Sequence, residues 1–168
     1  MTPLKLLARR RVPLGFAAGA AALWLARPTP RSLMFGAAVA ICGELLRIWA
    51  AGHLEKGREV TTSGPYRLTR HPLYVGSTII GAGLAIASAR VIVAVLVAAY
   101  LAITLSAAIA TEEAHLTQKF GEAYPAYREG RIGGEPRRFS AARAMRNREY
   151  RAVIGLAATL ALLSWKAL

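Results

Sequence analysis

The chain has 168 residues, of which 55% are hydrophobic and only 18% are charged, and its formal net charge is +13. A soluble domain would carry ~25% charged residues, and the apolar residues here fall in blocks, so composition favours an integral membrane protein over a soluble domain with a large core. The basic residues lie between the blocks, which is typical of cytoplasmic loops facing anionic lipid and argues against nucleic acid as a partner.

Five apolar blocks follow one another along the chain. About 20 helical residues are needed to cross a hydrocarbon core of ~30 Å. The expected crossings are 12–26, 32–50, 73–88, 91–110 and 152–168. The fourth has the required length, whereas the first and third need extension into their flanks or local thinning of the bilayer. The sequence therefore predicts an all-α polytopic membrane bundle of about five transmembrane helices, forming one domain over 1–168.

The first block has the basic flank of a signal peptide, because Lys5 and Arg9 to Arg11 precede it. However, Arg27-Pro28 follows it without a small-residue cleavage site, so we expect this block to be retained as a helix. The second block contains the single cysteine, Cys42. A lone cysteine excludes an intrachain disulfide and a cysteine-based metal cluster, and we expect this one to be a small buried thiol.

Two charged residues, Glu44 and Arg47, lie inside the second block and share a helix face. Two interpretations of them stay open. Ionisable residues at this depth usually face a polar cavity or a partner, which would make them the wall of a site. Alternatively, they neutralise each other near the interface while the arginine extends toward the headgroups.

The third and fourth blocks are joined only at Ala89-Arg90, which predicts a tight helical hairpin. Small residues are frequent at the start of this hairpin, and they allow membrane helices to approach closely. We therefore interpret Gly76 and its small neighbours first as packing residues.

The distribution of Lys and Arg predicts the orientation. With the N-terminus inside, the inner segments 1–11, 51–72 and 111–151 hold four, four and nine of these residues, against four at outer positions. This positive-inside bias places the N-terminus and both polar motifs described below in the cytoplasm, as in a bacterial inner-membrane protein.

The first polar motif, residues 64–76, reads Gly-Pro-Tyr-Arg-Leu-Thr-Arg-His-Pro-Leu-Tyr-Val-Gly. Its opening is a turn signal, and Pro72 suits the first turn of a helix. His71 and Tyr74 should therefore lie at the inner mouth of the third helix, where Arg70 and the helix N-terminus favour a carboxylate. The alternative is an ordinary basic interface cluster with an anchoring tyrosine.

The second motif follows the fourth crossing. Glu112 and Glu113 emerge near the end of a helix, where acidic residues oppose the helix dipole and lack a simple stabilising role. Such carboxylates can bind a ribose diol, an amine or a sulfonium cation, although a solvated helix face remains the alternative. A double crossing between the two motifs returns them to one side of the membrane, so they can build one site.

Competing chemistry is not apparent in the sequence. It contains no phosphate loop, nucleophile elbow or HExxH motif. The three histidines, His53, His71 and His115, do not pair at ligand spacing, so we predict no metal.

The order of these pieces resembles the isoprenylcysteine carboxyl methyltransferase family and the related phospholipid N-methyltransferases. The pieces are Gly-Pro-Tyr-Arg, Arg-His-Pro-x-Tyr-x-Gly, a hydrophobic hairpin, Glu-Glu-x-x-Leu and Phe-Gly-x-x-Tyr-x-x-Tyr. The likeness covers residues 43–128. It implies an integral-membrane enzyme that binds S-adenosylmethionine in a cytosolic pocket over the helix ends, while a lipophilic or lipidated acceptor enters from the bilayer.

The resemblance also implies roles for individual residues. Residues of the cofactor site would be His71, Pro72, Leu73, Tyr74, Gly76, Glu112, Glu113 and Tyr124. Residues that act on the acceptor would be Arg70, Glu112, Glu113 and Arg128. Tyr124, Tyr127 and Arg128 would form a lid. An arginine suits a carboxylate acceptor, which we favour slightly, and a glutamate suits the amine of a phospholipid.

The chain departs from the family pattern after Arg128. A basic cytosolic segment, 129–151, leads into the last crossing, and its Arg143, Arg146 and Arg151 fit a helix lying on anionic lipid. Two other functions stay open: an NADPH-dependent membrane reductase, for which no dinucleotide fingerprint is present, and a non-catalytic lipid-binding or assembly protein. The acceptor, the choice between O- and N-methylation, and the oligomeric state are left open by the sequence.

Overall fold

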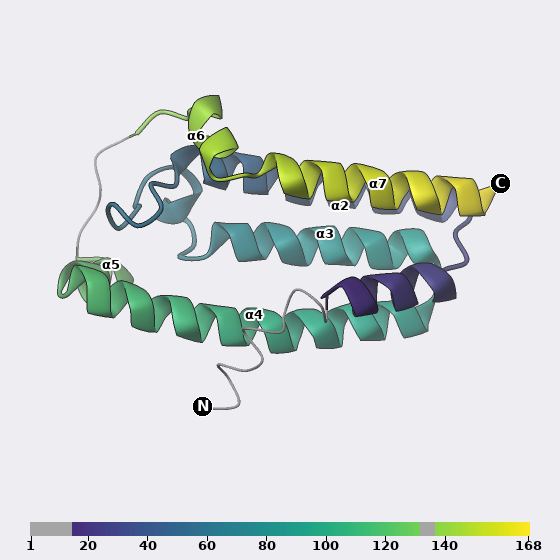
Figure 1. Ribbon diagram of the computed structural model, residues 1–168, viewed down its shortest axis with the longest axis horizontal. Helices are drawn as coiled ribbons and strands as arrows, with labels where there is room; N and C mark the ends of the chain where they lie inside the picture. Colours follow the sequence, from purple (N-terminus) through teal and green to yellow (C-terminus); the bar gives the residue numbers. More distant parts are fainter. Residues whose placement is uncertain (1–14, 132–136) are drawn as a thin grey trace.

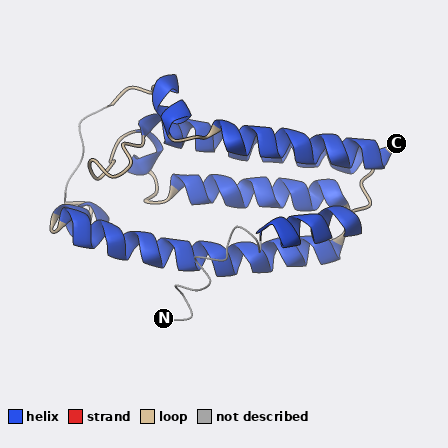
Figure 2. Cartoon of the chain, in the orientation of Figure 1, coloured by secondary structure: helices blue, strands red, loops and turns tan. Residues whose placement is uncertain are grey.

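A computed structural model of the protein describes residues 15–131 and 137–168. Within these ranges helix is the only regular secondary structure (Figure 2), which confirms the predicted all-α class. The long helices lie side by side along one axis and form an elongated bundle (Figure 1). The N-terminal basic flank and the start of the first expected crossing lie outside the described residues.

The helix Gly15–Leu25 comes first. It is followed by α2 (Pro30–His53), the 3-10 helix η1 (Gly64–Arg67), α3 (Pro72–Ser88), α4 (Val91–Phe120), α5 (Ala123–Arg128), α6 (Ala141–Arg146) and α7 (Tyr150–Ala167). Each expected crossing coincides with one of these helices. By length and composition two of them, α2 and α4, can cross a membrane, and the number five stays a prediction.

The start of α2 explains why this helix is longer than expected. Thr29 caps it, and its hydroxyl accepts a hydrogen bond from the Ser32 amide at 3.1 Å. In return the Ser32 hydroxyl accepts from the Thr29 amide at 2.9 Å, so the two residues form a capping box. Pro30 occupies the first turn, where its missing amide hydrogen is not needed.

Helices α2 and α3 approach closely because glycines face each other at two levels. A Cβ added to Gly36 would lie 2.5 Å from the Gly83 carbonyl oxygen, and one added to Gly43 would lie 2.7 Å from the Gly76 carbonyl oxygen. In both helices the two glycines are seven residues apart, so they return to the same face. The packing role predicted for the small residues of α3 is therefore observed, with Gly76 against α2.

The predicted hairpin between α3 and α4 is also present. Ala89 ends α3 in the left-handed conformation, with φ of 51°, and Arg90 precedes α4 directly. Gly81 faces the other way from Gly76, since its added Cβ would lie 2.5 Å from the Leu101 Cδ1 atom of α4. Glycines on two sides of α3 thus allow α2 and α4 to pack against it.

The outer surface of the bundle is rich in exposed apolar side chains, as expected for helices that face lipid. Those on α2 are Met34, Phe35, Ile41, Leu45 and Trp49. Cys42 is exposed on the same helix, so the expectation of a buried thiol was wrong. The close contact with α3 is made by Gly36, Ala40 and Gly43, and Cys42 lies outside it.

An apolar cavity of about 270 Å³ lies inside the bundle. Its walls come from the helix Gly15–Leu25, α3, α4 and α7, with Ala22, Leu84, Val97 and Leu163 among the lining residues. Lys166 closes α7 against the first helix by donating to the Leu23 carbonyl at 2.8 Å.

Candidate active site

The two motifs meet at one end of the bundle, which we call the motif end. Here α2 ends at His53, α3 begins at Pro72, α4 ends at Phe120 and α7 begins at Tyr150. Figure 1 shows these termini together with the short helices α5 and α6. The predicted return of both motifs to one place is therefore observed.

The first motif folds locally as its residues predict. Gly64, with φ of 58°, opens η1, and Pro65 occupies the first turn of that helix. His71 then precedes α3 in a non-helical conformation, with Pro72 in the first turn of the helix. The rings of His71 and Tyr74 stack, with centroids 5.6 Å apart and planes 23° from parallel.

The twin glutamates of α4 contact this first motif through hydrogen bonds. Glu113 Oε1 lies 3.0 Å from His71 Nε2 and accepts from Arg70 Nη1 at 3.1 Å. Glu112 Oε2 accepts from the Tyr74 hydroxyl at 2.6 Å. We call these five residues the motif cluster. They join positions about forty residues apart, which identifies Glu112 and Glu113 as more than a solvated helix face.

The length of α4 places the glutamates beyond the hydrocarbon. The helix has 30 residues, and ~20 suffice for the bilayer core, so its last turns project from the membrane. Hydrogen bonding to His71 and the charge of Arg70 hold the pKa of the Glu113 carboxyl below its ordinary value, despite partial burial. Glu113 is therefore an anion at neutral pH.

The tyrosines of the second motif fold back over the first. Tyr124 in α5 is only 2% exposed, and burial together with the nearby charge of Glu113 raises its pKa to about 12. The Tyr127 hydroxyl donates to the Tyr66 carbonyl at 2.6 Å, which ties α5 to η1. These contacts hold α5 beside the first motif, and the lid formed by the two tyrosines stays a prediction.

Other residues predicted for the site lie at its edge. Pro72 is buried, and the Leu73 carbonyl accepts from Ser77 at 2.9 Å on the side of α3 toward α2. Gly76 lies against Gly43 in the helix interface. Arg128 is exposed and makes no hydrogen bond or ion pair with any other described residue. The structure therefore brings together Arg70, His71, Tyr74, Glu112, Glu113 and Tyr124, and leaves Arg128 apart.

Arg47, Glu44 and Glu149 form a second charged group. The sequence predicted that Glu44 and Arg47 lie close together, but it did not predict the contact with Glu149. Arg47 Nε donates to Glu149 Oε1 at 2.7 Å, whereas its distance to Glu44 Oε2 is 3.9 Å. Arg47 also donates to the Ser77 hydroxyl at 2.5 Å, so it joins α2, α3 and the start of α7. Both carboxylate oxygens of Glu44 are buried without a hydrogen-bond donor among the described residues. The principal partner of Arg47 is thus 102 residues away, which no local pattern could reveal.

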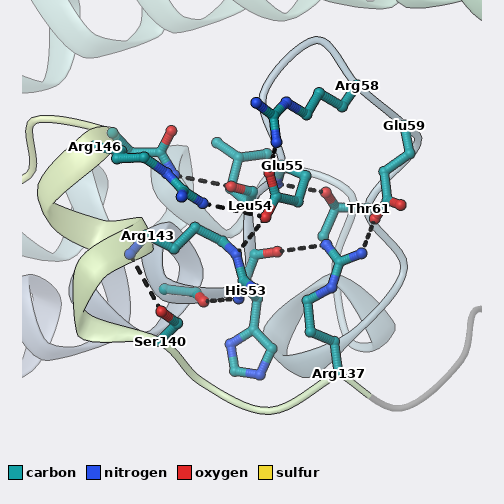
Figure 3. A network of polar contacts seen from close by, with 12 residues as sticks. His53, Leu54, Glu55, Arg58, Glu59, Thr61, Arg137, Ser140, Arg143 and Arg146 are labelled. Atoms are coloured by element: carbon teal, nitrogen blue, oxygen red, sulfur yellow. Dashed lines mark hydrogen bonds and ion pairs between the residues drawn. The ribbon is translucent and has the colours of Figure 1, made fainter.

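The basic segment also differs from expectation. We call the group of Glu55, Arg137, Arg143, Arg146 and Asn147 the basic corner, and Figure 3 shows its glutamate and three arginines. Arg143 Nε donates to Glu55 Oε1 at 2.7 Å, and its Nη1 donates to the Gly52 carbonyl at 2.5 Å. The Asn147 amide donates to the Ala51 and Leu54 carbonyls at 2.8 and 2.9 Å.

These bonds satisfy carbonyl groups that α2 leaves unpaired at its C-terminus. The expectation that Arg143 lies on lipid was therefore wrong, because its side chain turns inward to cap α2 and is only 15% exposed. Arg146 and Arg151 are exposed, as expected. The density of arginine after residue 136 was the available signal, but it did not reveal which residue turns inward.

Two anions, a histidine and an arginine within one partly exposed cluster can bind a zwitterionic ligand through both of its charges. Carboxylates attract a cation, while Arg70 and the N-terminus of α3 attract an anion. Among the described residues, no group of three His, Cys, Asp or Glu side chains is arranged to hold a metal ion.

Comparison with known proteins supports the assignment of this site. Residues 47–123 match the model of the phospholipid methyltransferase family, a region a little under half of the chain that contains the whole motif cluster. The resemblance inferred from the motifs is thereby confirmed, and the match supports a membrane methyltransferase.

Two curated relatives are also similar. The cobalt-zinc-cadmium resistance protein CzcN of Cupriavidus metallidurans is 35% identical over 91 residues, which are 53% of this chain and 41% of the relative. The nickel-cobalt-cadmium resistance protein NccN of Alcaligenes xylosoxydans xylosoxydans is 33% identical over 91 residues, with the same coverage. The chain thus spans about two fifths of the length of these relatives. No solved structure matches it significantly.

Proposed function

We propose that this protein is an S-adenosylmethionine-dependent methyltransferase that acts on a lipophilic acceptor at the cytoplasmic surface of a bacterial inner membrane. The observation that carries the proposal is the pair of hydrogen bonds His71–Glu113 and Tyr74–Glu112, which unite both family motifs at one end of the bundle. The positive-inside bias of the sequence supports the cytoplasmic location of that end.

The residues of the motif cluster fit the chemical groups of the cofactor. Glu112 and Glu113 supply negative charge for a sulfonium or ammonium group, or acceptors for a ribose diol. Arg70 and His71 supply donors for a carboxylate, and the stacked His71 and Tyr74 rings offer an aromatic surface. Each of these residues also has an internal partner in the described structure, so binding exchanges bonds within the cluster for bonds to the ligand.

The protein contributes mainly positioning. When bound, S-adenosylmethionine would supply an electrophilic methyl group, which bonds to an acceptor oxygen while the carbon–sulfur electron pair stays on sulfur. A carboxylate acceptor needs no general base, and Arg70 is placed to orient it. The covering tyrosines Tyr124 and Tyr127 help to exclude water from the nucleophile. The apolar cavity between α3, α4 and α7 provides room for part of a lipid chain.

A second acceptor is favoured by a specific observation. The matching family is described as phospholipid methyltransferase, and a phospholipid amine is a different nucleophile from a carboxylate. An amine must lose its proton before attack, and Glu112 or Glu113 could accept that proton. Identification of the methylated product decides between the two acceptors.

The direct test has two steps. Calorimetry of the purified protein should show binding of S-adenosylmethionine and not of NADPH. Incubation with the cofactor labelled on its methyl group and with a membrane lipid extract should then yield a labelled lipid or lipidated product. Glu113→Ala and His71→Ala should each weaken cofactor binding, whereas Glu122→Gln, at the exposed glutamate that precedes α5, serves as the matched control.

Wild-type affinity in both site variants would refute the site assignment. Binding without turnover on any lipid acceptor would favour the non-catalytic lipid-binding alternative, and binding of NADPH in place of S-adenosylmethionine would favour the reductase.

A further inference from the structure

A second cavity of about 270 Å³ lies at the motif end, beside the basic corner. Its lining residues come from the turn that follows α2 and from α6. Four of them are cations, namely Lys56, Arg58, Arg143 and Arg146, and one is an anion, Glu55. None of them belongs to the motif cluster, so this cavity is separate from the candidate active site.

The single carboxylate of the cavity does not balance its cations. Glu55 is engaged by Arg143 at 2.7 Å and lies 3.4 Å from Arg146 and 3.9 Å from Arg58. Hydrogen bonding to Arg143 also keeps the pKa of Glu55 below its ordinary value, so Glu55 carries its full charge at neutral pH. One negative charge among four positive charges leaves a strong local excess of positive charge, which attracts an anion.

The cations differ in how firmly the protein holds them. Arg143 is 15% exposed and fixed by its bonds to α2, whereas Arg146 is 63% and Arg58 is 78% exposed. Lys56 makes no hydrogen bond or ion pair with any residue in the described ranges. Gly57 between Lys56 and Arg58 has φ of 73°, which shapes the turn that presents both side chains. The cavity therefore combines one fixed, mostly covered cation with three exposed cations that can close on a ligand.

The position of the cavity indicates the source of such an anion. It begins at Leu54, directly after α2, and α2 has 24 residues, which is enough to bring this point to the headgroup region. Exposed apolar side chains lie nearby, with Trp49 on the last turns of α2 and Met145 on α6. An amphipathic aromatic residue and basic residues at one level are typical of a membrane interface.

We propose that this cavity binds the phosphate of an anionic membrane lipid, with Lys56, Arg58 and Arg146 gathering around the headgroup against the fixed Arg143. The site is independent of methyl transfer, and its occupant is a lipid of the surrounding bilayer rather than the methyl acceptor. Because Arg143 caps the end of α2, a phosphate bound against it also stabilises the junction of α2 with α6.

The test compares the full chain in bilayer nanodiscs and in detergent. In detergent, phosphatidylglycerol, phosphatidylcholine and inorganic phosphate are each titrated, while binding is followed by native mass spectrometry and by the change in Tm. We expect phosphatidylglycerol to bind at least about tenfold more tightly than phosphatidylcholine, since each cation near an anionic headgroup strengthens the attraction. Inorganic phosphate should raise the Tm less than phosphatidylglycerol does at equal concentration.

The informative variant is the double substitution Lys56→Gln with Arg58→Gln. Both side chains are exposed and lie outside the capping bonds of α2, so this variant should fold and lose about tenfold in phosphatidylglycerol affinity. The matched control is Arg138→Gln with Arg151→Gln, which removes two exposed cations outside the cavity. In nanodiscs, the excess Tm of wild type in anionic over zwitterionic lipid should shrink in the double variant and persist in the control.

Equal loss of affinity in the variant and the control would show a diffuse surface charge and overturn the proposal. Equal effects of inorganic phosphate and phosphatidylglycerol would assign the cavity to a free anion and overturn the lipid source. Should the double variant not fold, the single Lys56→Gln variant and the salt dependence of wild-type binding replace it, and affinity unchanged by either would count against the proposal.

Discussion

The motif cluster and the basic corner lie at the same end of the bundle and both pair arginine with glutamate, but they differ in what their other polar groups contact. In the motif cluster, arginine, histidine and tyrosine donate to carboxylate side chains of α4. In the basic corner, Arg143 and Asn147 donate to backbone carbonyls of α2 and its end.

Side-chain pairs can be exchanged for a ligand without unfolding a helix, whereas capping bonds hold a helix end in place. Exposure points the same way. The Arg70–Glu113 pair is 44% and 25% exposed, and the Arg143–Glu55 pair is 15% and 18% exposed. The difference suits the motif cluster to the binding role proposed for it, while the inner part of the basic corner holds the end of α2 in place.

The largest effect should come from removing the central anion of the motif cluster. Glu113→Ala deletes the shared partner of Arg70 and His71, and we expect methyl transfer to fall at least about 100-fold because both donors lose their fixed positions. The pair is partly exposed, so the Tm should change little. Turnover and Tm are measured on the same preparation. A variant that loses stability together with activity would break the distinction between the two regions.

The next largest effect should be a loss of stability without a loss of cofactor binding. Arg143→Met removes the cap on Gly52 and the partner of Glu55, and we expect the Tm to fall by about 5 °C while cofactor affinity stays near wild type. Arg146→Met is the matched control, since Arg146 is 63% exposed and 3.4 Å from the same carboxylate. Similar losses of Tm in both variants would show that charge alone, rather than capping, sets the stability of this corner.

Much of this architecture was predictable because it depends on local pattern. The five apolar blocks predicted the long helices, and Pro72 predicted the start of α3. The double crossing between the motifs predicted that His71 and Glu113 lie close together. The roles of Arg143 and Glu149 were not predictable, because their partners lie 88 and 102 residues away. A single sequence records which residues are basic, but not which of them turns toward a helix end.

The fourth crossing shows what helical spacing adds to hydropathy. Its apolar block ends near residue 110, but Leu116 and Phe120 repeat at helical spacing and predict an amphipathic extension, and α4 does continue to Phe120. Hydropathy reports where a helix leaves the hydrocarbon and carries no information on where it stops in water. The extension matters because it carries Glu112 and Glu113 to the first motif.

Acid should weaken both regions by the same physical route. Hydrogen bonds from His71 and Arg143 lower the pKa of Glu113 and Glu55, respectively, below the ordinary value of 4.5. Each carboxylate therefore stabilises the folded state above pH 4.5, and that contribution is lost as the pH falls through the lowered values. The Tm of wild type should fall as the pH drops below 4.5. Glu55→Gln should show a flatter decline, whereas Glu113→Gln should follow wild type closely, because its ion pair is partly exposed and adds little stability.

The pH dependence of cofactor affinity tests whether the two regions act independently. Protonation of Glu113 removes the anion of the motif cluster, so affinity should fall in the same acid range in wild type and in Glu55→Gln alike. An acid loss of affinity that disappears in Glu55→Gln would mean that the two regions are coupled.

The smallest effect should come from the lid. Tyr127→Phe removes the hydrogen bond to the Tyr66 carbonyl and keeps the ring, so we expect a loss of about 1 kcal/mol in the free energy of holding α5 against η1. The measurement is the KM for the cofactor, which should rise a few-fold while the Tm stays within error. Tyr150→Phe, at an exposed tyrosine of α7, is the control.

The glycine pairs of α2 and α3 have a consequence for how this protein can change. Backbone contacts at Gly36–Gly83 and Gly43–Gly76 set the spacing of the two helices, so the residues on their outer faces contribute little to it. Outer residues can therefore change without altering the spacing of the two helices, whereas a larger residue at any of the four glycines would push α3, with His71 at its start, away from α2.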